Sequence, residues 1–271
     1  MRTAFRVSAG RAALAAEVDG DGPLLVCLHA GVCDRRMWTT LTGELRSSHR
    51  VVAYDRRGFG ETPAVDEPRS QVDDLCAVLD HPSVGSPAIL IGCSQGGRIA
   101  IDAALQYPDR VRALVLIAPA VSGAPEPTTV AAPIQTLVTA LEAAESAEDV
   151  EQINAIEARL WLDGPLCAEG RVSGPLRELV LDMNGIALRA PPMPSLRQPP
   201  AAYDRLEQIK APTLVLCGDL DFPHLQERCA DIVRRVPGAV GQVLEGTAHL
   251  PTMEQPARSA AIIRAFVAQH R

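Results

Sequence analysis

Residues 89–100 read Ile89-Leu90-Ile91-Gly92-Cys93-Ser94-Gln95-Gly96-Gly97-Arg98-Ile99-Ala100, an apolar run that leads directly into the pattern G-x-S-x-G. The run predicts a buried strand, and the small residues after it predict a helix packed closely against that strand. A serine at so sharp a turn is held in a strained backbone conformation with its hydroxyl raised above the sheet, and the flanking glycines leave room for the chain. The pattern therefore indicates that Ser94 is a nucleophile, although a helix-capping serine in an ordinary glycine-rich turn would read similarly.

Short aliphatic runs alternate with amphipathic helical patterns on both sides of this turn. The runs are continuously apolar, which is typical of parallel strands covered on both faces by helices. This repetition predicts a single doubly wound α/β core, and the alternation over residues 5–18 fits an antiparallel pair at one sheet edge. The runs are Leu24 to Leu28, Val51 to Tyr54, Ala88 to Cys93, Ala113 to Ile117, Thr213 to Cys217 and, more weakly, Ala239 to Leu244.

One interval, residues 122–206, contains no strand-like run. Its length of about 85 residues is too great for an ordinary connection, so it must have structure of its own. Apolar residues recur there at helical spacing in three places, and a proline-rich tail at residues 190–200 predicts an extended return to the core. We therefore predict a helical cap, or lid, over residues 122–206, inserted between a first core part at 1–121 and a second at 207–271.

Composition excludes several classes of protein. The 271 residues carry 26 Lys plus Arg against 33 Asp plus Glu, a net charge of -7, so no basic face is expected for nucleic acid. No run of about 18 uncharged apolar residues occurs, which predicts no membrane span and a cytoplasmic protein. The seven cysteines include no C-x-x-C pair, so neither a disulfide framework nor a zinc site is expected.

A serine nucleophile needs a base and a carboxylate that orients the base. Of the six histidines, His249 follows the last strand-like run, and sites in open α/β sheets gather at the carboxyl ends of the strands. Two residues with carboxylate side chains, Asp219 and Asp221, follow another strand-like run, and either carboxylate could reach the imidazole. The chain order serine, aspartate, histidine is that of one particular serine hydrolase fold.

Together these residues resemble the α/β-hydrolase superfamily over essentially the whole core. The resemblance implies the α/β-hydrolase fold, with a mostly parallel central sheet flanked by helices and an inserted helical cap. Beside the serine turn, the matching segments are Leu28-His29-Ala30-Gly31 before Trp38, Tyr54-Asp55-Arg56-Arg57-Gly58-Phe59-Gly60-Glu61-Thr62, Gly218-Asp219-Leu220-Asp221 and Gly246-Thr247-Ala248-His249.

The resemblance also implies roles for individual residues. In the family's G-x-x-D pattern the catalytic acid is the last residue, which falls on Asp221, with Asp219 as the alternative. The third position of the family's H-G-x loop, here Gly31, and the residue after the nucleophile, Gln95, would lend backbone N–H groups to an oxyanion hole. Ala30 replaces the usual first glycine of that loop. No metal or organic cofactor is implied.

The leading hypothesis is a serine hydrolase that cleaves a small carboxylic ester or lactone through a Ser-His-Asp triad and an acyl-enzyme. A serine at the turn argues against the dehalogenase and epoxide hydrolase branches, which have aspartate there. Details such as Met37-Trp38 and the cap segment 160–165 are similar to small bacterial hydrolases grouped with 3-oxoadipate enol-lactonases. In the cap, Trp161 and Met183 are candidate pocket residues, although amphipathic helices need apolar residues merely to pack.

Other functions use the same scaffold. One alternative is hydrolysis of a carbon–carbon bond in a diketone, and another is a biosynthetic cyclase, acyltransferase or thioesterase. A non-enzymatic alternative is a ligand-binding protein of hydrolase fold. In each enzymatic case we expect a small-molecule carbonyl substrate, with neither nucleic acid nor membrane as partner; the sequence does not decide between the reactions or give the oligomeric state.

Overall fold

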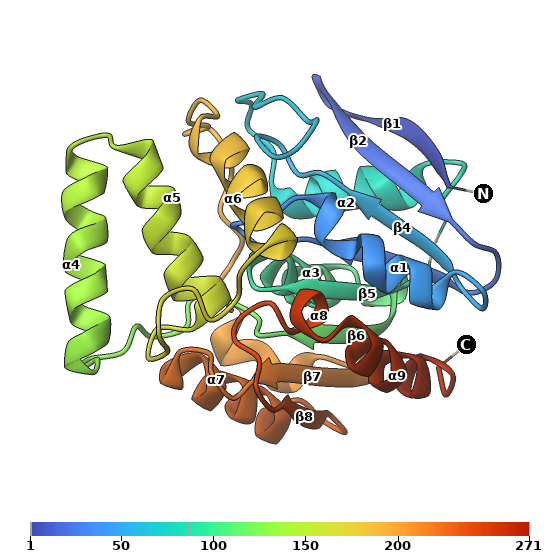
Figure 1. The fold of residues 1–271 in the computed structure, drawn as a ribbon. Coiled ribbons are helices and arrows are strands. Elements are labelled where there is room, and N and C mark those ends of the chain that lie inside the picture. The colour runs from blue at the N-terminus through green and yellow to red at the C-terminus, as the bar shows by residue number, and fades with distance from the viewer. Residues whose placement is uncertain (1, 86, 271) are drawn as a thin grey trace.

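A computed structural model describes residues 2–85 and 87–270 of the chain. Eight strands form one sheet in the order β1-β2-β4-β3-β5-β6-β7-β8, as Figure 1 shows. The β1–β2 and β2–β4 pairs are antiparallel, and the other pairs are parallel, so the predicted mostly parallel sheet with an antiparallel edge is confirmed. The strands are β1 Thr3–Ala9, β2 Ala12–Asp19, β3 Leu24–Leu28, β4 Arg50–Tyr54, β5 Ala88–Cys93, β6 Val111–Ile117, β7 Thr213–Gly218 and β8 Val240–Leu244.

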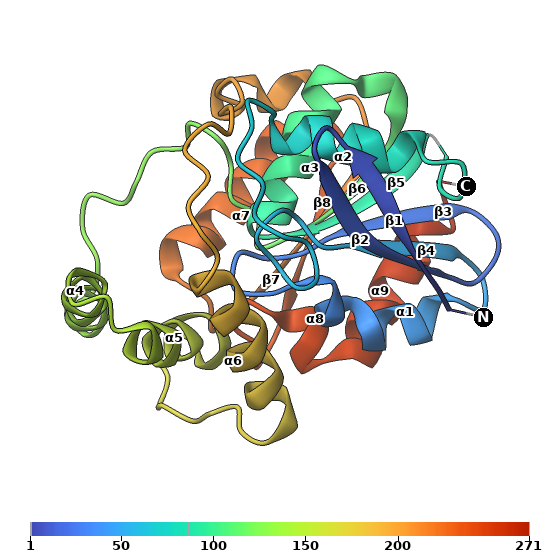
Figure 2. The same ribbon diagram turned by 90° about the horizontal axis from the view of Figure 1, so that it is seen from above.

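Helices cover both faces of this sheet, as Figure 2 shows from above. Successive strand residues point to opposite faces, so Leu25 packs with one layer and Val26 with the other. One layer contains α2 Gln71–Asp80, α3 Gln95–Gln106 and α7 Pro223–Arg235; the other contains α1 Thr39–Leu45, α8 Pro251–Glu254 and α9 Pro256–Val267. Short 3-10 turns lie at Arg35–Trp38, Pro108–Arg110 and Tyr203–Gln208.

Strand β8 differs from the expectation that every core strand is covered on both faces. Val240 is 51% exposed and Val243 is 50% exposed, and Leu244 alone is buried among the five residues of the strand. The reason is its position at the sheet edge, where it pairs with β7 and has no strand beyond it. An apolar sequence run thus predicted the strand correctly but not its exposure.

Residues 122–206 lie between β6 and β7 and contain helices but no strand among the residues described, and we call them the helical insertion. It contains α4 Ala132–Ser146, α5 Val150–Ala158, a π-helical turn Arg159–Asp163 and α6 Pro175–Leu188. Helix α4 packs on α5 and α5 on α6, and Figure 2 shows α4 farthest from the sheet. Apolar residues of α4 and α5 also pack against Phe222 and Leu225, so the insertion is attached to the core through α7.

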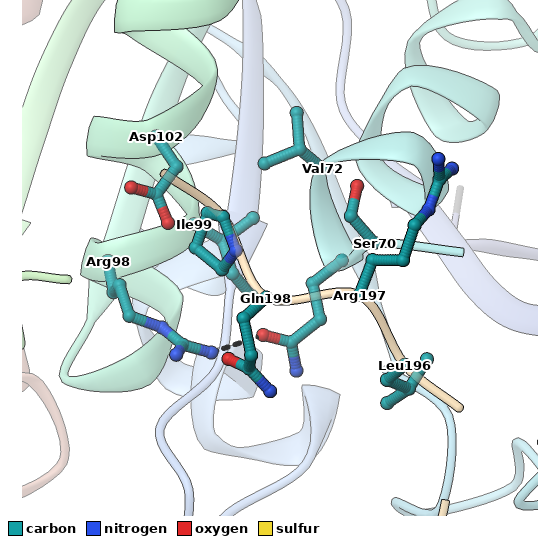
Figure 3. A pocket seen from close by; sticks show the side chains of 10 residues that line it. Ser70, Val72, Arg98, Ile99, Asp102, Leu196, Arg197 and Gln198 are labelled. Carbon is teal, nitrogen blue, oxygen red and sulfur yellow. Dashed lines mark hydrogen bonds between the residues drawn. The ribbon is translucent and has the colours of Figure 1, made fainter. Parts of the chain in front are cut away.

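Ser122 ties the two ends of the insertion together. Its carbonyl oxygen accepts hydrogen bonds from the backbone N–H groups of Ala202 and Tyr203 at 2.8 and 3.0 Å. Its hydroxyl donates to Oδ1 of Asp102 at 2.7 Å. Asp102 lies on α3 in the wall of a cavity of about 100 Å³, which α2 and the returning chain near Arg197 complete (Figure 3).

Replacement of Asp102 by asparagine should make stability less dependent on pH. Burial raises the pKa of Asp102 to about 6, whereas an unfolded aspartate titrates near pH 4. The carboxyl group therefore favours the folded state below about pH 4, and this contribution is lost as the pH rises to about 6. We expect Asp102→Asn to raise the free energy of unfolding relative to wild type at pH 7 but not at pH 4, measured by urea denaturation.

The control for this experiment is Asp109→Asn, which removes an exposed carboxylate in the same part of the chain. Its effect should be small and equal at the two pH values. If Asp102→Asn changes the free energy of unfolding by the same amount at pH 4 and at pH 7, the raised pKa of Asp102 is contradicted.

Candidate active site

The sequence-predicted residues follow four strands of the sheet. Gly31 lies after β3, Ser94 directly after β5, Asp221 after β7 and His249 after β8. These strands run parallel to one another, so their carboxyl ends meet at one sheet edge. The fold thus places at one sheet edge residues that are up to 218 positions apart (31 to 249) in the sequence.

Ser94 occupies a backbone conformation that side chains rarely adopt, with φ 51° and ψ -115°. Its N–H donates to the carbonyl oxygen of Ile117 at 2.9 Å, which fixes the turn against β6. A Cβ atom at Gly96 would lie 2.1 Å from the carbonyl oxygen of Leu28, and one at Gly92 would lie 2.5 Å from that of Gly96. Both glycines are therefore required for α3 to begin directly against the ends of β3 and β5.

Asp221 and His249 form a buried hydrogen-bonded pair. Nδ1 of His249 lies 2.7 Å from Oδ2 of Asp221, and the other carboxylate oxygen accepts from the N–H of Phe222 at 2.7 Å. Because a carboxylate only accepts, the proton lies on Nδ1 and the lone pair on Nε2. Nε2 is buried and has no hydrogen-bond partner among the described residues, so a bond from the Ser94 hydroxyl is not formed in this structure.

The segments that carry Ser94 and His249 are nevertheless in contact. Cys93 donates from Sγ to the carbonyl oxygen of His249 at 3.7 Å. Hydrogen bonds between a nucleophile and its base are often long in the absence of substrate and tighten when substrate binds. Burial raises the pKa of the Cys93 thiol well above its ordinary value, and that of Cys33 as well, so neither sulfur competes as a thiolate nucleophile.

The alternative acid, Asp219, lies in a different position. Its side chain is exposed, and Oδ1 accepts from the backbone N–H of Gly246 at 2.6 Å. It therefore anchors the loop that leads to His249 and does not bond the imidazole. Of the two carboxylates, Asp221 is the one in contact with the histidine.

His29, which closes β3, does not offer a free base. Its Nε2 accepts from the backbone N–H of Arg56 at 3.1 Å, so the proton lies on Nδ1, which donates to the carbonyl oxygen of Ala30 at 2.8 Å. Burial lowers the pKa of His29 well below its ordinary value, which keeps the ring neutral. The imidazole thus shapes the turn before Gly31.

The two candidate pocket residues of the helical insertion differ in position. The Trp161 ring lies 4.6 Å from the His249 ring, and the Trp161 carbonyl oxygen accepts from the His249 N–H at 3.2 Å. Trp161 belongs to the π-helical turn, a local geometry frequent at functional sites. Met183 is completely buried, and its sulfur accepts from the Asp34 N–H at 3.4 Å, so it packs behind the loop that follows β3.

The His249 loop is also braced by residues that the sequence reasoning missed. Arg171 of the helical insertion donates to the carbonyl oxygen of Gly246 at 3.1 Å and forms a salt bridge with Glu254. Glu254 in turn accepts from the N–H of Ala248 at 2.9 Å. Nothing in the sequence signals this, because Arg171 lies far from the loop along the chain.

The two candidate oxyanion donors are adjacent. A Cβ atom added at Gly31 would lie 2.8 Å from Nε2 of Gln95, so the Gln95 carboxamide lies directly over Gly31. Within the described part of the chain, the backbone N–H groups of Gly31 and Gln95 have no hydrogen-bond acceptor. They are therefore free to bind an oxygen atom of a ligand.

Arg56, for which the sequence indicated no individual role, lies behind these donors. Its side chain is buried and donates from Nη1 to Oε1 of Gln95 at 2.9 Å and from Nη2 to the carbonyl oxygen of Ala30 at 3.0 Å. The guanidinium stacks on the Phe59 ring at 4.3 Å. Burial lowers the pKa of Arg56 to about 10, so the group stays cationic at neutral pH.

Three further features of the described residues bear on ligands and environment. No group of three or more His, Cys, Asp or Glu side chains among them is placed to hold a metal ion. Their helices are all too short or too polar to cross a membrane. All seven cysteines are free thiols.

Comparison with known proteins gives matches over nearly the whole chain. The sequence model of the alpha/beta hydrolase family matches residues 25–262. A Bacillus subtilis protein, provisionally named 2-succinyl-6-hydroxy-2,4-cyclohexadiene-1-carboxylate synthase, is 28% identical over 95% of this chain and 94% of its own. The pimeloyl-[acyl-carrier protein] methyl ester esterase of Aeromonas salmonicida is 25% identical over 92% and 96%. A thermophilic esterase from Thermogutta terrifontis superposes with a TM-score of 0.76 at 27% identity and covers 100% of both chains.

The short bond between Asp221 and His249 should be visible by proton NMR. A strong hydrogen bond to a carboxylate deshields the imidazole proton and protects it from exchange, so we expect a resolved low-field N–H resonance in the wild-type protein. Asp221→Asn should abolish or strongly shift this signal. The matched variant Asp219→Asn should leave it in place, and the opposite pattern would mean that Asp219 holds the imidazole.

Proposed function

Because the chain belongs to the α/β hydrolase family, we propose that it cleaves a small carboxylic ester or lactone with Ser94 as nucleophile, His249 as base and Asp221 as acid. The observation that carries this proposal is the buried His249 imidazole, held by Asp221 at Nδ1 and left with a free lone pair at Nε2. The family includes esterases that match the chain over nearly its full length, which supports an ester as the substrate class.

The first step is attack by the serine. As Oγ of Ser94 bonds to the substrate carbonyl carbon, its proton passes to Nε2 of His249. Asp221 keeps the Nδ1 proton in place and stabilises the imidazolium that results. This step requires the Ser94 hydroxyl to come within hydrogen-bond distance of Nε2 when the substrate is bound.

The second step is collapse of the tetrahedral intermediate. Its negative oxygen binds the backbone N–H groups of Gly31 and Gln95, and each such donor typically contributes about 2.7 to 4 kcal/mol to the barrier reduction. The bond from carbon to the leaving oxygen breaks, and His249 returns its proton to that oxygen. Water then attacks the acyl group on Ser94 by the same sequence, which releases the acid and restores the enzyme.

The helical insertion, residues 122–206, acts in this proposal as a cap on the core formed by residues 1–121 and 207–271. Among its contacts with the site is that of Trp161, whose ring lies against His249. A side chain in that position would form part of the wall of the substrate pocket and limit the access of water to the imidazole.

The nucleophile is tested with a fluorophosphonate probe, which reacts only with an activated serine. We expect the folded protein to be labelled at Ser94, as located by peptide mass spectrometry, and Ser94→Ala to abolish both labelling and hydrolysis. Removing a triad serine costs about 10⁶-fold in kcat. The exposed-serine variant Ser173→Ala should be labelled normally; a folded wild-type protein that resists the probe would favour a ligand-binding protein.

The acid is tested by comparing two asparagine variants in ester hydrolysis. Loss of the orienting carboxylate typically lowers kcat by about 10⁴-fold, so Asp221→Asn should be nearly inactive. Asp219→Asn should lose far less, because Asp219 bonds only the Gly246 backbone. The reverse ranking would reject Asp221 as the acid.

The substrate class is tested by a panel of p-nitrophenyl esters, lactones, thioesters and vinylogous diketones, with Ser94→Ala as the control. We expect turnover of small esters or lactones that the control lacks. Turnover confined to diketones would indicate carbon–carbon bond hydrolysis, and turnover confined to thioesters would indicate a thioesterase or acyltransferase.

A further inference from the structure

The buried charge of Arg56 is not matched by a carboxylate. The neighbouring Arg57 is equally buried and forms salt bridges with Asp74 at 2.6 Å and Glu67 at 2.7 Å. Arg56 instead donates to a backbone carbonyl and to a glutamine side chain, and its Nε has no partner among the residues described. An unpaired buried cation is costly to a fold, so its position beside the candidate oxyanion donors calls for a functional explanation.

Arg56 determines which way the Gln95 carboxamide faces. A guanidinium has only donors, so the atom 2.9 Å from Nη1 must be the amide oxygen. Nε2 of Gln95 then points away from Arg56 and lies over Gly31. A Cβ atom added at Gly31 would lie only 2.8 Å from this Nε2. The Gln95 side chain is exposed, and its NH₂ group donates to none of the described residues, so a substrate can reach it.

We propose that Nε2 of Gln95 is a side-chain donor to the oxyanion, in addition to the backbone N–H groups of Gly31 and Gln95. Arg56 is then the positioning residue for this donor. Its unshared charge polarises the amide through Oε1, which makes the NH₂ group a stronger hydrogen-bond donor to the oxyanion. Its field also favours the negative charge that develops in the transition state. The inference rests on the proposed function, because an oxyanion forms only if Ser94 attacks a carbonyl group.

The same geometry explains why residue 31 is a glycine. Its φ does not lie in the left-handed region, so its backbone would accept an alanine. A methyl group there would instead collide with the Gln95 carboxamide, which is the nearest part of the structure. Gly31→Ala therefore keeps both backbone donors and displaces only the side-chain amide.

The decisive experiment is a double-mutant cycle between Gly31→Ala and Gln95→Ala. Loss of one oxyanion donor typically lowers kcat by about 100-fold or more, and we expect each single variant to lose activity of that order with little change in KM. Gln95→Ala leaves room for the methyl group, so the double variant should be no slower than Gln95→Ala alone. Single effects that multiply in the double variant, or a fully active Gln95→Ala, would overturn the proposal.

Gln95→Glu separates a donor from a merely structural glutamine. The new carboxylate still accepts from Arg56 and forms a salt bridge, so the protein should stay folded, but the donor is replaced by a negative oxygen. We expect kcat to fall further than in Gln95→Ala, and the inhibition constant of a trifluoromethyl ketone transition-state analogue to rise by a similar factor. The control Gln106→Glu adds the same charge at the exposed far end of α3 and should be as active as wild type. Unchanged inhibition by the ketone in Gln95→Glu would contradict a contact with the oxyanion.

The positioning role of Arg56 is tested with Arg56→Met, which replaces an unpaired cation by an apolar chain of similar length. Such a change often preserves or raises stability, so the melting temperature should not fall while kcat does. In the Gln95→Ala background the same change should have a much smaller effect on kcat, and Arg56→Lys should restore part of the wild-type rate. An equal loss with and without Gln95 would show that Arg56 acts independently of the amide.

These outcomes are distinct from failure of the proposed function. If the folded wild-type protein is not labelled by the fluorophosphonate, the proposed function and this inference fall together. If it is labelled and hydrolyses esters while the Gln95 and Gly31 variants keep their kcat, only the inference is wrong.

Discussion

The close approach of α3 to the carboxyl end of β3 is the constraint on which the candidate site depends. The Gly96 backbone packs so tightly on the Leu28 carbonyl oxygen that no side chain fits between them. This forces Ser94 into a conformation that costs of order 1 to 3 kcal/mol, offset in part by its backbone hydrogen bonds to Ile117 and Ala120. One consequence is that the start of α3 lies beside the loop after β3, with the Gln95 carboxamide over Gly31.

Charge is distributed unequally around this turn. Most buried ionic groups are paired, as Arg57 is with Asp74, and such pairs hold loops in place without creating a net field. Asp221 is paired instead with an imidazole, so the candidate site contains a histidine whose tautomer is fixed. Arg56 is the contrasting case. It is a cation beside the loop after β3, and the groups that accept its hydrogen bonds are neutral. Electrostatic preorganisation is commonly the largest contribution to catalysis. A buried positive charge without a carboxylate partner therefore marks this part of the structure as a place where negative charge could be stabilised.

The helical insertion contacts the His249 loop from outside the sheet. Trp161 contacts the His249 ring and backbone, and Arg171 braces the same loop through Gly246 and Glu254. Helical periodicity predicted that this segment is helical, because spacing along one helix is local information. It could not predict that a π-helical turn would bring Trp161 to His249, since that depends on how the helical insertion packs against the core. The exposure of β8 escaped prediction for a similar reason, because its neighbours are set by the order of strands in the sheet.

The sequence by itself determined the strand-to-helix turn at Ser94, the mostly parallel sheet and the candidate residues at its edge, because these follow from local sterics, apolar periodicity and the rule that parallel strands end together. It also offered two carboxylates without distinguishing them. Only the tertiary structure decided that Asp221 bonds the imidazole and that Asp219 anchors the preceding loop. It likewise decided that of two adjacent arginines one is neutralised by carboxylates and the other is not. These pairings depend on distances between segments that are far apart in the chain, and only the packing of the folded protein sets those distances.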